Sequence, residues 1–416
     1  MKYPDLQALI VCRSLLQDPV VAAAGELLQL EGAPPQVVRS LQSKLAGLLL
    51  EQAETLGLAG NLWQQYLLFL LGEGDNVAAR TAAAGGKTAG SLVKALAQDL
   101  RLLRPYLEMP ASALVPLAFL DAYQPAVPGR NQYLTRLEQA VGEGRTPAAA
   151  AKALLAYYGR YGSGSLNRYL AFKLDSAGKL FGIKEFPQVD FKDIIGYAPQ
   201  KEKLRLNTDK FVRGRQGNNV LLTGTRGTGK SMSVKAIVNL YGAAGLRLVQ
   251  VDKNQVADLA GIMSMLGAIK THKFIIFFDD LSFKEEEAGY KYLKSVIDGG
   301  LTQQPDNVLI YATSNRRHLL KETWKERSDD LAEVYRNDNF NETISLSDRF
   351  GLILHYGDLS QDEYLQIIEH KLREKGFVLS GEALRLEGVR WEMEHSGRNG
   401  RIAEQFVRWY AGTHDR

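Results

Sequence analysis

The sequence predicts an α/β domain built on a parallel sheet, preceded by an all-helical domain and followed by a smaller helical one. From about residue 218, short β-branched runs (NNVLLTG, LRLVQVD, KFIIFFDD, NVLIYATSN and GLILHY) alternate with helical segments. Continuous apolar strands separated by helices are typical of a parallel sheet covered on both faces. Before this region, and again after residue 356, apolar residues recur at helical spacing instead.

The composition is that of an ordinary globular protein. The 416 residues exceed what one hydrophobic core normally serves, so we expect more than one domain. The 51 basic and 47 acidic side chains give a net charge of +4, which neither requires nor excludes a nucleic-acid partner. The single cysteine, Cys12, cannot form an internal disulfide. The N-terminus carries Pro4, Asp5 and Arg13 where a signal peptide needs an apolar run, and no segment is long enough to span a bilayer, so we expect a cytoplasmic protein without a membrane partner.

The same patterns predict the domain boundaries. Residues 1–170 are expected to form the helical N-terminal domain, with prolines such as Pro19, Pro35 and Pro105 at helix boundaries. Residues 171–192, where glycine, aromatic and basic residues mix, are expected to be a partly structured connector, either a packed tether or a surface for single-stranded nucleic acid. Residues 193–356 are expected to form the α/β core, and residues 357–416 a helical lid.

The stretch LLTGTRGTGKSMS at 221–233 predicts a phosphate-binding loop. Gly224, Gly229, Lys230 and Ser231 complete G-x-x-x-x-G-K-S between an apolar strand and a helical segment, the context this motif requires. Lys230 is expected to reach the β- and γ-phosphates, and the Ser231 hydroxyl to coordinate Mg²⁺. The whole loop is expected to contact the nucleotide through Gly224, Thr225, Arg226, Gly227, Thr228, Gly229, Lys230, Ser231 and Met232.

Polar residues follow two further predicted strands. Asp279 and Asp280 end FIIFFDD, and Asn315 follows NVLIYATS. Because ligands of open α/β sheets bind at the carboxyl ends of the strands, these side chains should lie beside the phosphate loop. Asp279 is the expected Mg²⁺ ligand and Asp280 the general base, or else a structural cap. Asn315 would hold the attacking water or a phosphate oxygen, or else serve a local turn. The sequence lacks an N-K-x-D stretch, which favours ATP over GTP.

The order of these motifs resembles that of the AAA+ ATPases, over residues 190–416. DIIGYAPQKEKL at 193–204 resembles the segment that covers the adenine in that superfamily, which assigns nucleotide contacts to Ile194, Ile195, Gly196 and Tyr197. The resemblance implies a five-stranded parallel P-loop core with Asn315 as the first sensor. LSDRFG at 346–351 matches the position of the arginine finger, which implies that role for Arg349.

The lid also resembles its AAA+ counterpart. SGRNGRIAEQF at 396–406 looks like the second-sensor helix, with Arg401 as the phosphate sensor and Arg398 as the competing choice. An arginine finger implies a homo-oligomer, because it completes the site of a neighbouring subunit.

A narrower resemblance concerns GYAPQKEKLRLNTDKFV, NNVLLTGTRGTGKS, FFDDLSF and LIYATSNRRHLL. They are similar to a bacterial AAA+ family with a helical N-terminal region that is classed as a domain of unknown function. Residues 252–266 lack the aromatic pore loop of the unfoldases of the superfamily, which argues against polypeptide threading. Residues 316–345 form a long charged insertion, either a solvated surface or a contact for an oligomer or client.

The leading functional hypothesis is a Mg²⁺-dependent ATPase that couples hydrolysis to conformational change or to remodelling of a partner protein. The first alternative is a nucleotide-gated binding module with negligible turnover, suggested by Asp280 where Glu is more usual. The second is a loader-type ATPase that remodels nucleic acid, suggested by the Asp279-Asp280 pair and the basic stretches.

Overall fold

The computed structural model describes residues 3–30, 32–85, 90–127, 129, 132–142, 146–175, 178–281, 288–297, 304–315, 349–395 and 397–414. The chain divides into two compact units. The first contains Met1–Tyr169 and Ile269–His272, and the second contains Leu170–Ala268 and Lys273–Arg416. The insertion at 316–345 lies outside the described residues, so its two interpretations stay open.

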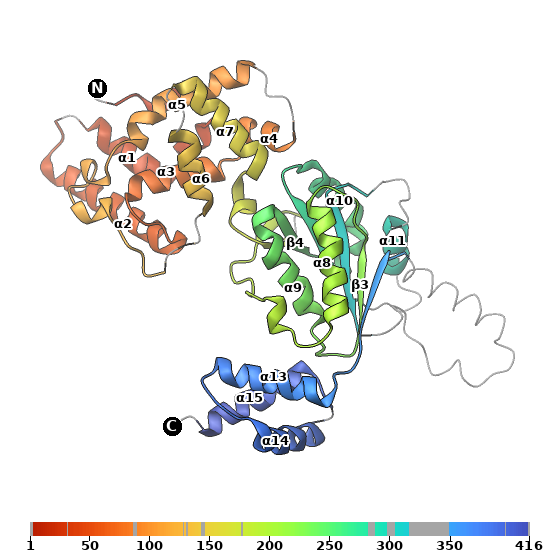
Figure 1. The fold of residues 1–416 in the computed structure, drawn as a ribbon. Coiled ribbons are helices and arrows are strands. Elements are labelled where there is room, and N and C mark those ends of the chain that lie inside the picture. The colour runs from red at the N-terminus through yellow and green to blue at the C-terminus, as the bar shows by residue number, and fades with distance from the viewer. Residues whose placement is uncertain are drawn as a thin grey trace. The chain divides into compact units, whose positions relative to one another are not determined.

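The first unit is built from α-helices, as predicted. Pro19 and Pro35 begin helices, where the missing N–H of proline costs nothing. Pro105 was expected to mark a boundary but lies inside the last turn of its helix, where a proline removes one hydrogen bond without stopping the helix. The helices of this unit are α1 (Pro19–Gln29), α2 (Pro35–Leu56), α3 (Leu62–Glu73), α4 (Val77–Ala83), α5 (Gly90–Leu107), α6 (Gln132–Gly142) and α7 (Pro147–Tyr161) (Figure 1).

A buried carboxylate on α5 fixes the N-terminal segment. Asp99 is fully buried. It accepts hydrogen bonds from the backbone N–H groups of Ile10, Val11 and Cys12 at 2.9, 2.7 and 2.7 Å. Burial, with the Asp99 carboxylate beside it, raises the pKa of the Cys12 thiol to about 12. The charge of Asp99 is therefore satisfied by donors that the folded backbone holds in place.

The second unit contains a sheet in the order β2-β1-β4-β5-β6-β3-β7. Neighbouring strands are parallel except β1 and β2. The five predicted strands lie together, which confirms the α/β fold class, and β2 and β1 extend the sheet from the segment expected to be a connector. That pair was not predicted because the two strands are short and β2 is not buried. The strands are β1 (Ala171–Leu174), β2 (Leu180–Gly182), β3 (Val220–Gly224), β4 (Leu246–Gln250), β5 (Lys273–Phe278), β6 (Val308–Ser314) and β7 (Leu352–Tyr356).

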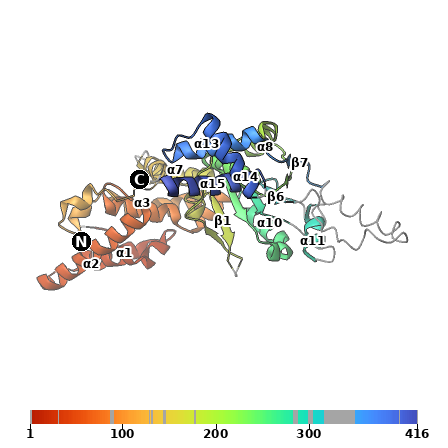
Figure 2. The ribbon, with the colours of Figure 1, turned by 90° about the horizontal axis from the view of Figure 1, so that it is seen from below.

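Helices cover both faces of this sheet (Figures 1 and 2). Leu204, Phe211, Val234 and Ile237 of α8 and α9 pack on the face that includes Leu222. Helices α10 and α11 lie on the opposite face. Because both faces are covered, the strands are largely apolar, and β3 is buried along its whole length. The helices are α8 (Ala198–Val212), α9 (Lys230–Tyr241), α10 (Leu259–Ala268) and α11 (Ala288–Ile297).

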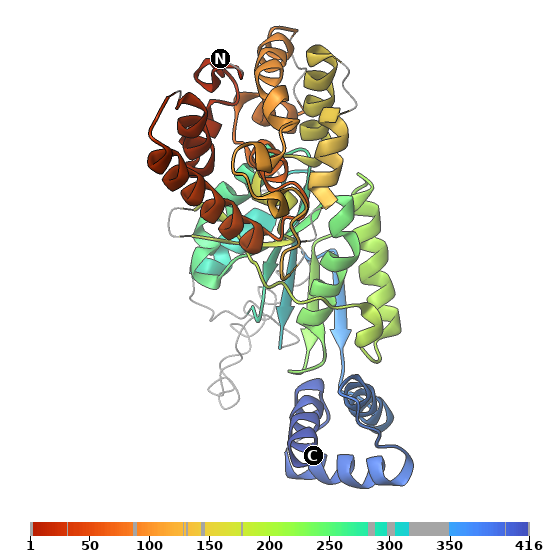
Figure 3. The same ribbon diagram turned by 90° about the vertical axis from the view of Figure 1, so that its left-hand side faces the viewer.

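The chain ends in a small helical group that follows β7 (Figure 3). Its core includes Tyr364, Ile368, Leu384 and Phe406. Ser360 begins it with a capping box. The backbone N–H of Glu363 donates to the Ser360 hydroxyl, and the Glu363 carboxylate accepts from the Ser360 N–H. The helices are α13 (Gln361–Glu374), α14 (Gly381–Glu394) and α15 (Gly400–His414). The predicted helical lid is thus present.

Candidate nucleotide-binding site

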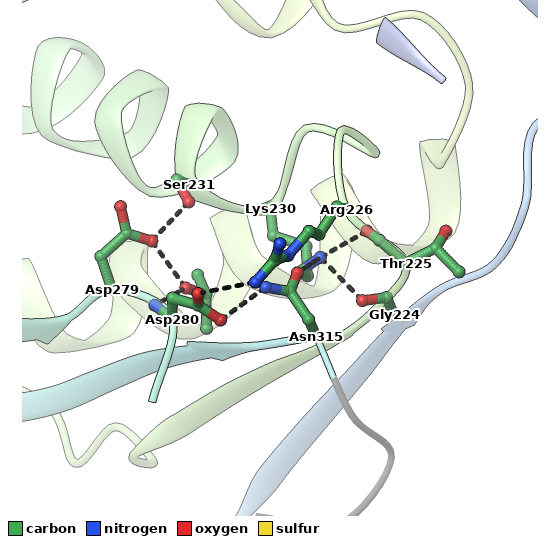
Figure 4. Close-up of polar contacts among 9 residues, drawn as sticks. Gly224, Thr225, Arg226, Lys230, Ser231, Asp279, Asp280 and Asn315 are labelled. Atoms are coloured by element: carbon green, nitrogen blue, oxygen red, sulfur yellow. Dashed lines mark hydrogen bonds and ion pairs between the residues drawn. The ribbon is translucent and has the colours of Figure 1, made fainter. Parts of the chain in front are cut away.

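The phosphate loop forms the turn between β3 and α9 (Figure 4). At Gly224, φ is 137°, and a Cβ there would lie 1.9 Å from the carbonyl oxygen of Tyr356. Only glycine fits at such a close approach of two strands. Gly229, at φ 87°, turns the chain into α9, whose first residue is Lys230. The loop therefore ends at a helix N-terminus, where unpaired N–H groups and the helix dipole favour an anion.

Lys230 is a buried cation whose contacts are neutral. The residue is only 6% exposed, and its ammonium group donates to the carbonyls of Gly224 and Thr225 at 2.8 and 2.6 Å. It also donates to the Asn315 side-chain oxygen at 3.1 Å. Among the described residues it forms no salt bridge, and burial lowers its pKa despite the nearby aspartates. An anion in front of the loop would compensate this charge, so the site fits a phosphate.

Asp279 connects the loop to the end of β5. Its Oδ1 accepts from the hydroxyl of Ser231 at 2.6 Å and from that of Thr313 at 2.7 Å. A serine hydroxyl and a carboxylate so close together are the oxygen ligands that Mg²⁺ prefers. The predicted metal ligands, Ser231 and Asp279, therefore lie next to each other and fit that ion.

Asp280 lies between the loop and the end of β6. Its backbone has φ 55°, in the left-handed region that non-glycine residues rarely adopt. Its N–H donates to the Thr313 hydroxyl at 2.9 Å, which holds this conformation. The Asn315 side-chain amide donates to its carboxylate, and the Arg226 guanidinium lies 3.7 Å from its second oxygen. Strained backbone of this kind is concentrated at functional sites, because the surrounding structure must enforce it.

These residues line a cavity of about 600 Å³ that also includes parts of the lid. Most of the predicted contacts line it: Ile194, Ile195, Tyr197, Arg226, Gly227, Thr228, Gly229, Lys230, Ser231, Met232, Asp279, Asp280, Asn315 and Arg401. Gly196, Gly224, Thr225 and Arg349 are not among its lining residues.

Gly224 and Thr225 nevertheless belong to the site through their carbonyls, which hold Lys230. Gly196 lies between two lining residues, at φ 77°.

The lid contacts the phosphate loop directly. The Gly400 N–H, at the start of α15, donates to the Gly227 carbonyl at 2.8 Å. A Cβ on Gly227 would lie 2.6 Å from the side-chain oxygen of Asn399, so a larger residue there would displace the lid. The Thr225 hydroxyl donates to Asp358 at 2.9 Å. These two hydrogen bonds join the lid and the segment that enters it to the phosphate loop.

The two competing arginines of the lid have different surroundings. Arg401 lines the cavity. Arg398 does not, and its guanidinium lies 2.8 Å from Glu392 in an ion pair within the lid. This geometry favours Arg401 as the phosphate sensor.

Arg349 lies at the other end of the sheet from the phosphate loop. It is exposed and precedes β7, whose first residue, Leu352, pairs with Val220 at the start of β3. The loop follows the opposite end of β3, about 13 Å further along the strand. Arg349 therefore lies away from the loop of its own chain, and its role as an arginine finger stays a prediction.

Sequence reasoning missed the lid residues of the cavity. Ile367, Lys371 and Glu404 line it together with Asp193 and Leu359. The spacing of Ile367 and Lys371, four residues apart on one helix, showed that they share a face. It did not show that this face is turned toward the nucleotide site.

Together, the strand order, the loop, the strand-end carboxylates and the lid define a P-loop nucleotide-binding protein of the AAA+ class. A family model extends this assignment: residues 167–414 match the family described as "Protein of unknown function (DUF815)". The chain belongs to that family, which confirms the predicted membership of an AAA+ family of unknown function.

Two curated proteins of the same class are similar to parts of the chain. The 26S proteasome regulatory subunit 7 of Dictyostelium discoideum is 30% identical over 122 residues, which are 26% of this chain. The ATP-dependent zinc metalloprotease FtsH of Aquifex aeolicus is 27% identical over 188 residues, which are 38% of this chain. The chain spans only 28% of the length of either relative.

Solved structures resemble part of the chain at low TM-scores. The RuvB Holliday junction branch migration motor of Thermotoga maritima has a TM-score of 0.37 and 21% identity, over 53% of this chain and 63% of its own. PCH-2 of C. elegans has a TM-score of 0.39 and 15% identity, over 54% of this chain and 65% of its own.

None of the described helices is both long enough and apolar enough to cross a membrane.

Proposed function

We propose that this chain is a Mg²⁺-dependent ATPase that couples hydrolysis to movement of its lid and to remodelling of a partner. The observation that carries the proposal is the environment of Lys230, a buried cation whose hydrogen-bond acceptors within the described part of the chain are all neutral. Lys230 lies at the N-terminus of α9, in a cavity that Asp279 and Asp280 also line. A nucleoside triphosphate would give the Lys230 ammonium group an anionic partner in place of these neutral acceptors.

Each side chain then has a distinct role. Ser231 and Asp279 would hold the Mg²⁺, which would supply neutralising charge for the phosphates. Lys230 exchanges its carbonyl contacts for phosphate oxygens. Asp280 accepts the proton of the attacking water, and the Asn315 amide orients its carboxylate. Arg401 senses the phosphate from the lid.

The direct contact between lid and loop offers a route for the coupling. The Gly400 N–H donates to the Gly227 carbonyl, so a phosphate that reshapes the loop also shifts the start of α15. The contact of Thr225 with Asp358 links the loop to the segment that enters the lid. Nucleotide binding and release would therefore change the lid position through hydrogen bonds already present.

The site is completed, in this proposal, by a neighbouring subunit of a homo-oligomer. Arg349 is exposed at the sheet edge opposite its own loop, so a guanidinium there can reach a γ-phosphate only in another copy of the chain. ATPase activity per subunit should then rise with protein concentration. Mixing Arg349→Ala with Lys230→Ala protein should restore part of the activity, whereas constant activity under dilution by a monomeric protein would contradict the shared site.

The decisive experiment is steady-state phosphate release by the full chain. Asp280→Asn should slow turnover about 100-fold or more while ATP binding is kept, as expected for loss of a general base. Asp252→Asn is the matched control, because Asp252 also follows a strand of this sheet, β4, but does not line the cavity. Equal effects of the two substitutions would contradict the role of Asp280.

The second candidate is a nucleotide-gated binding module with negligible turnover. It is favoured by the contacts of Asp280, because one carboxylate oxygen accepts from the Asn315 amide and the other lies 3.7 Å from the Arg226 guanidinium. In that case the wild-type protein would bind ATP but release phosphate no faster than Asp280→Asn. Stimulation of phosphate release by DNA would instead support the loader-type alternative.

A further inference from the structure

A second group of metal-ligating side chains lies between the core and the lid of the second unit. Asp193 ends the 3-10 helix Phe191–Asp193, and His370 and Glu374 lie on α13. Each offers one ligand atom, and the three atoms lie within 4.8 Å of one another. None of these residues was assigned a metal from the sequence.

The spacing of the two lid residues fits a tetrahedral metal. Residues i and i+4 of a helix share a face, so His370 and Glu374 project side by side. Their Nε2 and Oε1 atoms are 3.4 Å apart. Zinc bonds of 2.0–2.1 Å at tetrahedral angles place two ligand atoms about 3.4 Å apart. Asp193 lies close enough to join this pair, because its ligand atom is within 4.8 Å of both.

An unsatisfied nitrogen points to a ligand at this position. The Nε2 atom of His370 is buried and has no hydrogen-bond partner among the described residues, although the Glu374 carboxylate is near. Buried polar atoms without a partner are rare, and a bound ion would satisfy this nitrogen. On the other side, the backbone N–H of Asp190 donates to Asp193 Oδ2 at 2.8 Å. This bond belongs to the capping box of the 3-10 helix, and it fixes the position of the Asp193 carboxylate.

We propose that Asp193, His370 and Glu374 bind a divalent transition metal of the Zn²⁺ type. Two carboxylates and a neutral imidazole compensate a +2 ion, and the imidazole nitrogen selects zinc over Mg²⁺ or Ca²⁺. Three protein ligands leave a fourth position for water. The site differs from the oxygen-only pair Ser231 and Asp279. Because Asp193 also lines the nucleotide cavity, bound zinc holds the lid against the core at that cavity.

Zinc titration of the full chain tests this proposal. Tag-free protein is stripped with EDTA, returned to buffer containing Mg²⁺, and titrated with ZnCl₂ in a calorimeter. Wild type should bind one equivalent more than His370→Ala, and Glu374→Gln should bind zinc about 100-fold or more weakly at this site. Glu369→Gln is the matched control, because it removes a carboxylate of the same helix that instead pairs with Arg373 at 2.6 Å; its zinc affinity should equal that of wild type.

Co²⁺ provides a second readout that does not depend on activity. It should give the intense visible absorption of a tetrahedral site in wild type and in Glu369→Gln, and lose it in His370→Ala and Glu374→Gln. Circular dichroism checks that each variant is folded, and two different ligand substitutions guard against misfolding of one. Zinc binding that is the same in all variants, or absent from wild type, would overturn the proposal and leave the three side chains as an ion-pair contact only.

Discussion

Asp99 in the first unit and Lys230 in the second are both buried charges, but their surroundings differ. Asp99 is fully buried and accepts three short hydrogen bonds from backbone N–H groups. Lys230 is 6% exposed and contacts two carbonyls and an amide oxygen, with no salt bridge among the described residues. The carboxylate has the donors that an anion needs, whereas the ammonium group has only partial compensation.

This contrast separates a structural charge from a functional one. The N–H donors around Asp99 are held by the fold, so the charge stabilises the N-terminal segment in the protein alone. Burial lowers the pKa of Lys230 although Asp279 and Asp280 lie nearby, which is the direction expected for a cation removed from water. A charge that is costly without a ligand and compensated with one is typical of a binding site.

The largest expected effect is that of Asp99→Ala on stability. The substitution leaves three buried N–H groups without an acceptor, and each can cost about 1–3 kcal/mol, so we expect the free energy of unfolding of the first unit to fall by about 4 kcal/mol. Urea denaturation measures it. Asp99→Asn, which keeps one acceptor oxygen, should lose less. A loss below about 1 kcal/mol for Asp99→Ala would show that the three bonds are not what fixes the segment.

Lys230→Ala should instead lower ATP affinity strongly and stability only slightly. ATP affinity should fall about 100-fold or more, because a charged hydrogen-bond donor to the terminal phosphates is lost. The free energy of unfolding without nucleotide should change by less than about 1 kcal/mol, since the cation is poorly compensated in that state. Calorimetry and urea denaturation measure the two quantities. Lys235→Ala, on the same helix but outside the cavity, is the control, and unchanged ATP binding by Lys230→Ala would refute the phosphate-loop assignment.

A smaller effect is expected for Thr313→Val. Its hydroxyl donates to Asp279 and accepts from the Asp280 N–H, so valine leaves both groups without that partner. Mg²⁺ affinity in the presence of ATP should fall about tenfold, as for loss of an outer hydrogen bond to a metal ligand. Thr208→Val is the control: it removes a buried hydroxyl bonded to Tyr311, away from the site, and should cost stability without changing Mg²⁺ affinity.

The smallest expected effect is the pH dependence contributed by Cys12. Burial raises the pKa of its thiol from near 9 to about 12, so the folded state holds this proton while the unfolded state releases it. The contribution of the thiol to the free energy of unfolding is complete below pH 9 and is lost as pH rises toward 12. At pH 10 the loss is about 1.4 kcal/mol. Urea denaturation at pH 8 and pH 10 should therefore show a larger fall in the free energy of unfolding between these pH values for wild type than for Cys12→Ala. Equal losses would contradict the raised pKa.

Much of the core site follows from the chain itself. Gly224 to Ser231 are contiguous, so their backbone geometry and helix start depend on local sequence. Asp279 and Asn315 could be placed because parallel strands end at the same edge of a sheet. The predicted α/β core and the family resemblance were confirmed for the same reason, since apolar runs and short motifs carry that information.

Contacts between segments distant in sequence could not be predicted in this way. The sequence shows that Ile367 and Lys371 share a helical face, but only the packing of the lid turns that face to the cavity. Asp99 reaches residues 10–12, and Asp193 lies near His370, because whole helices and strands pack together. The physical reason is one of scale: a loop or strand end is set by a few neighbouring residues, whereas a contact across the fold depends on the shape and burial of many side chains at once.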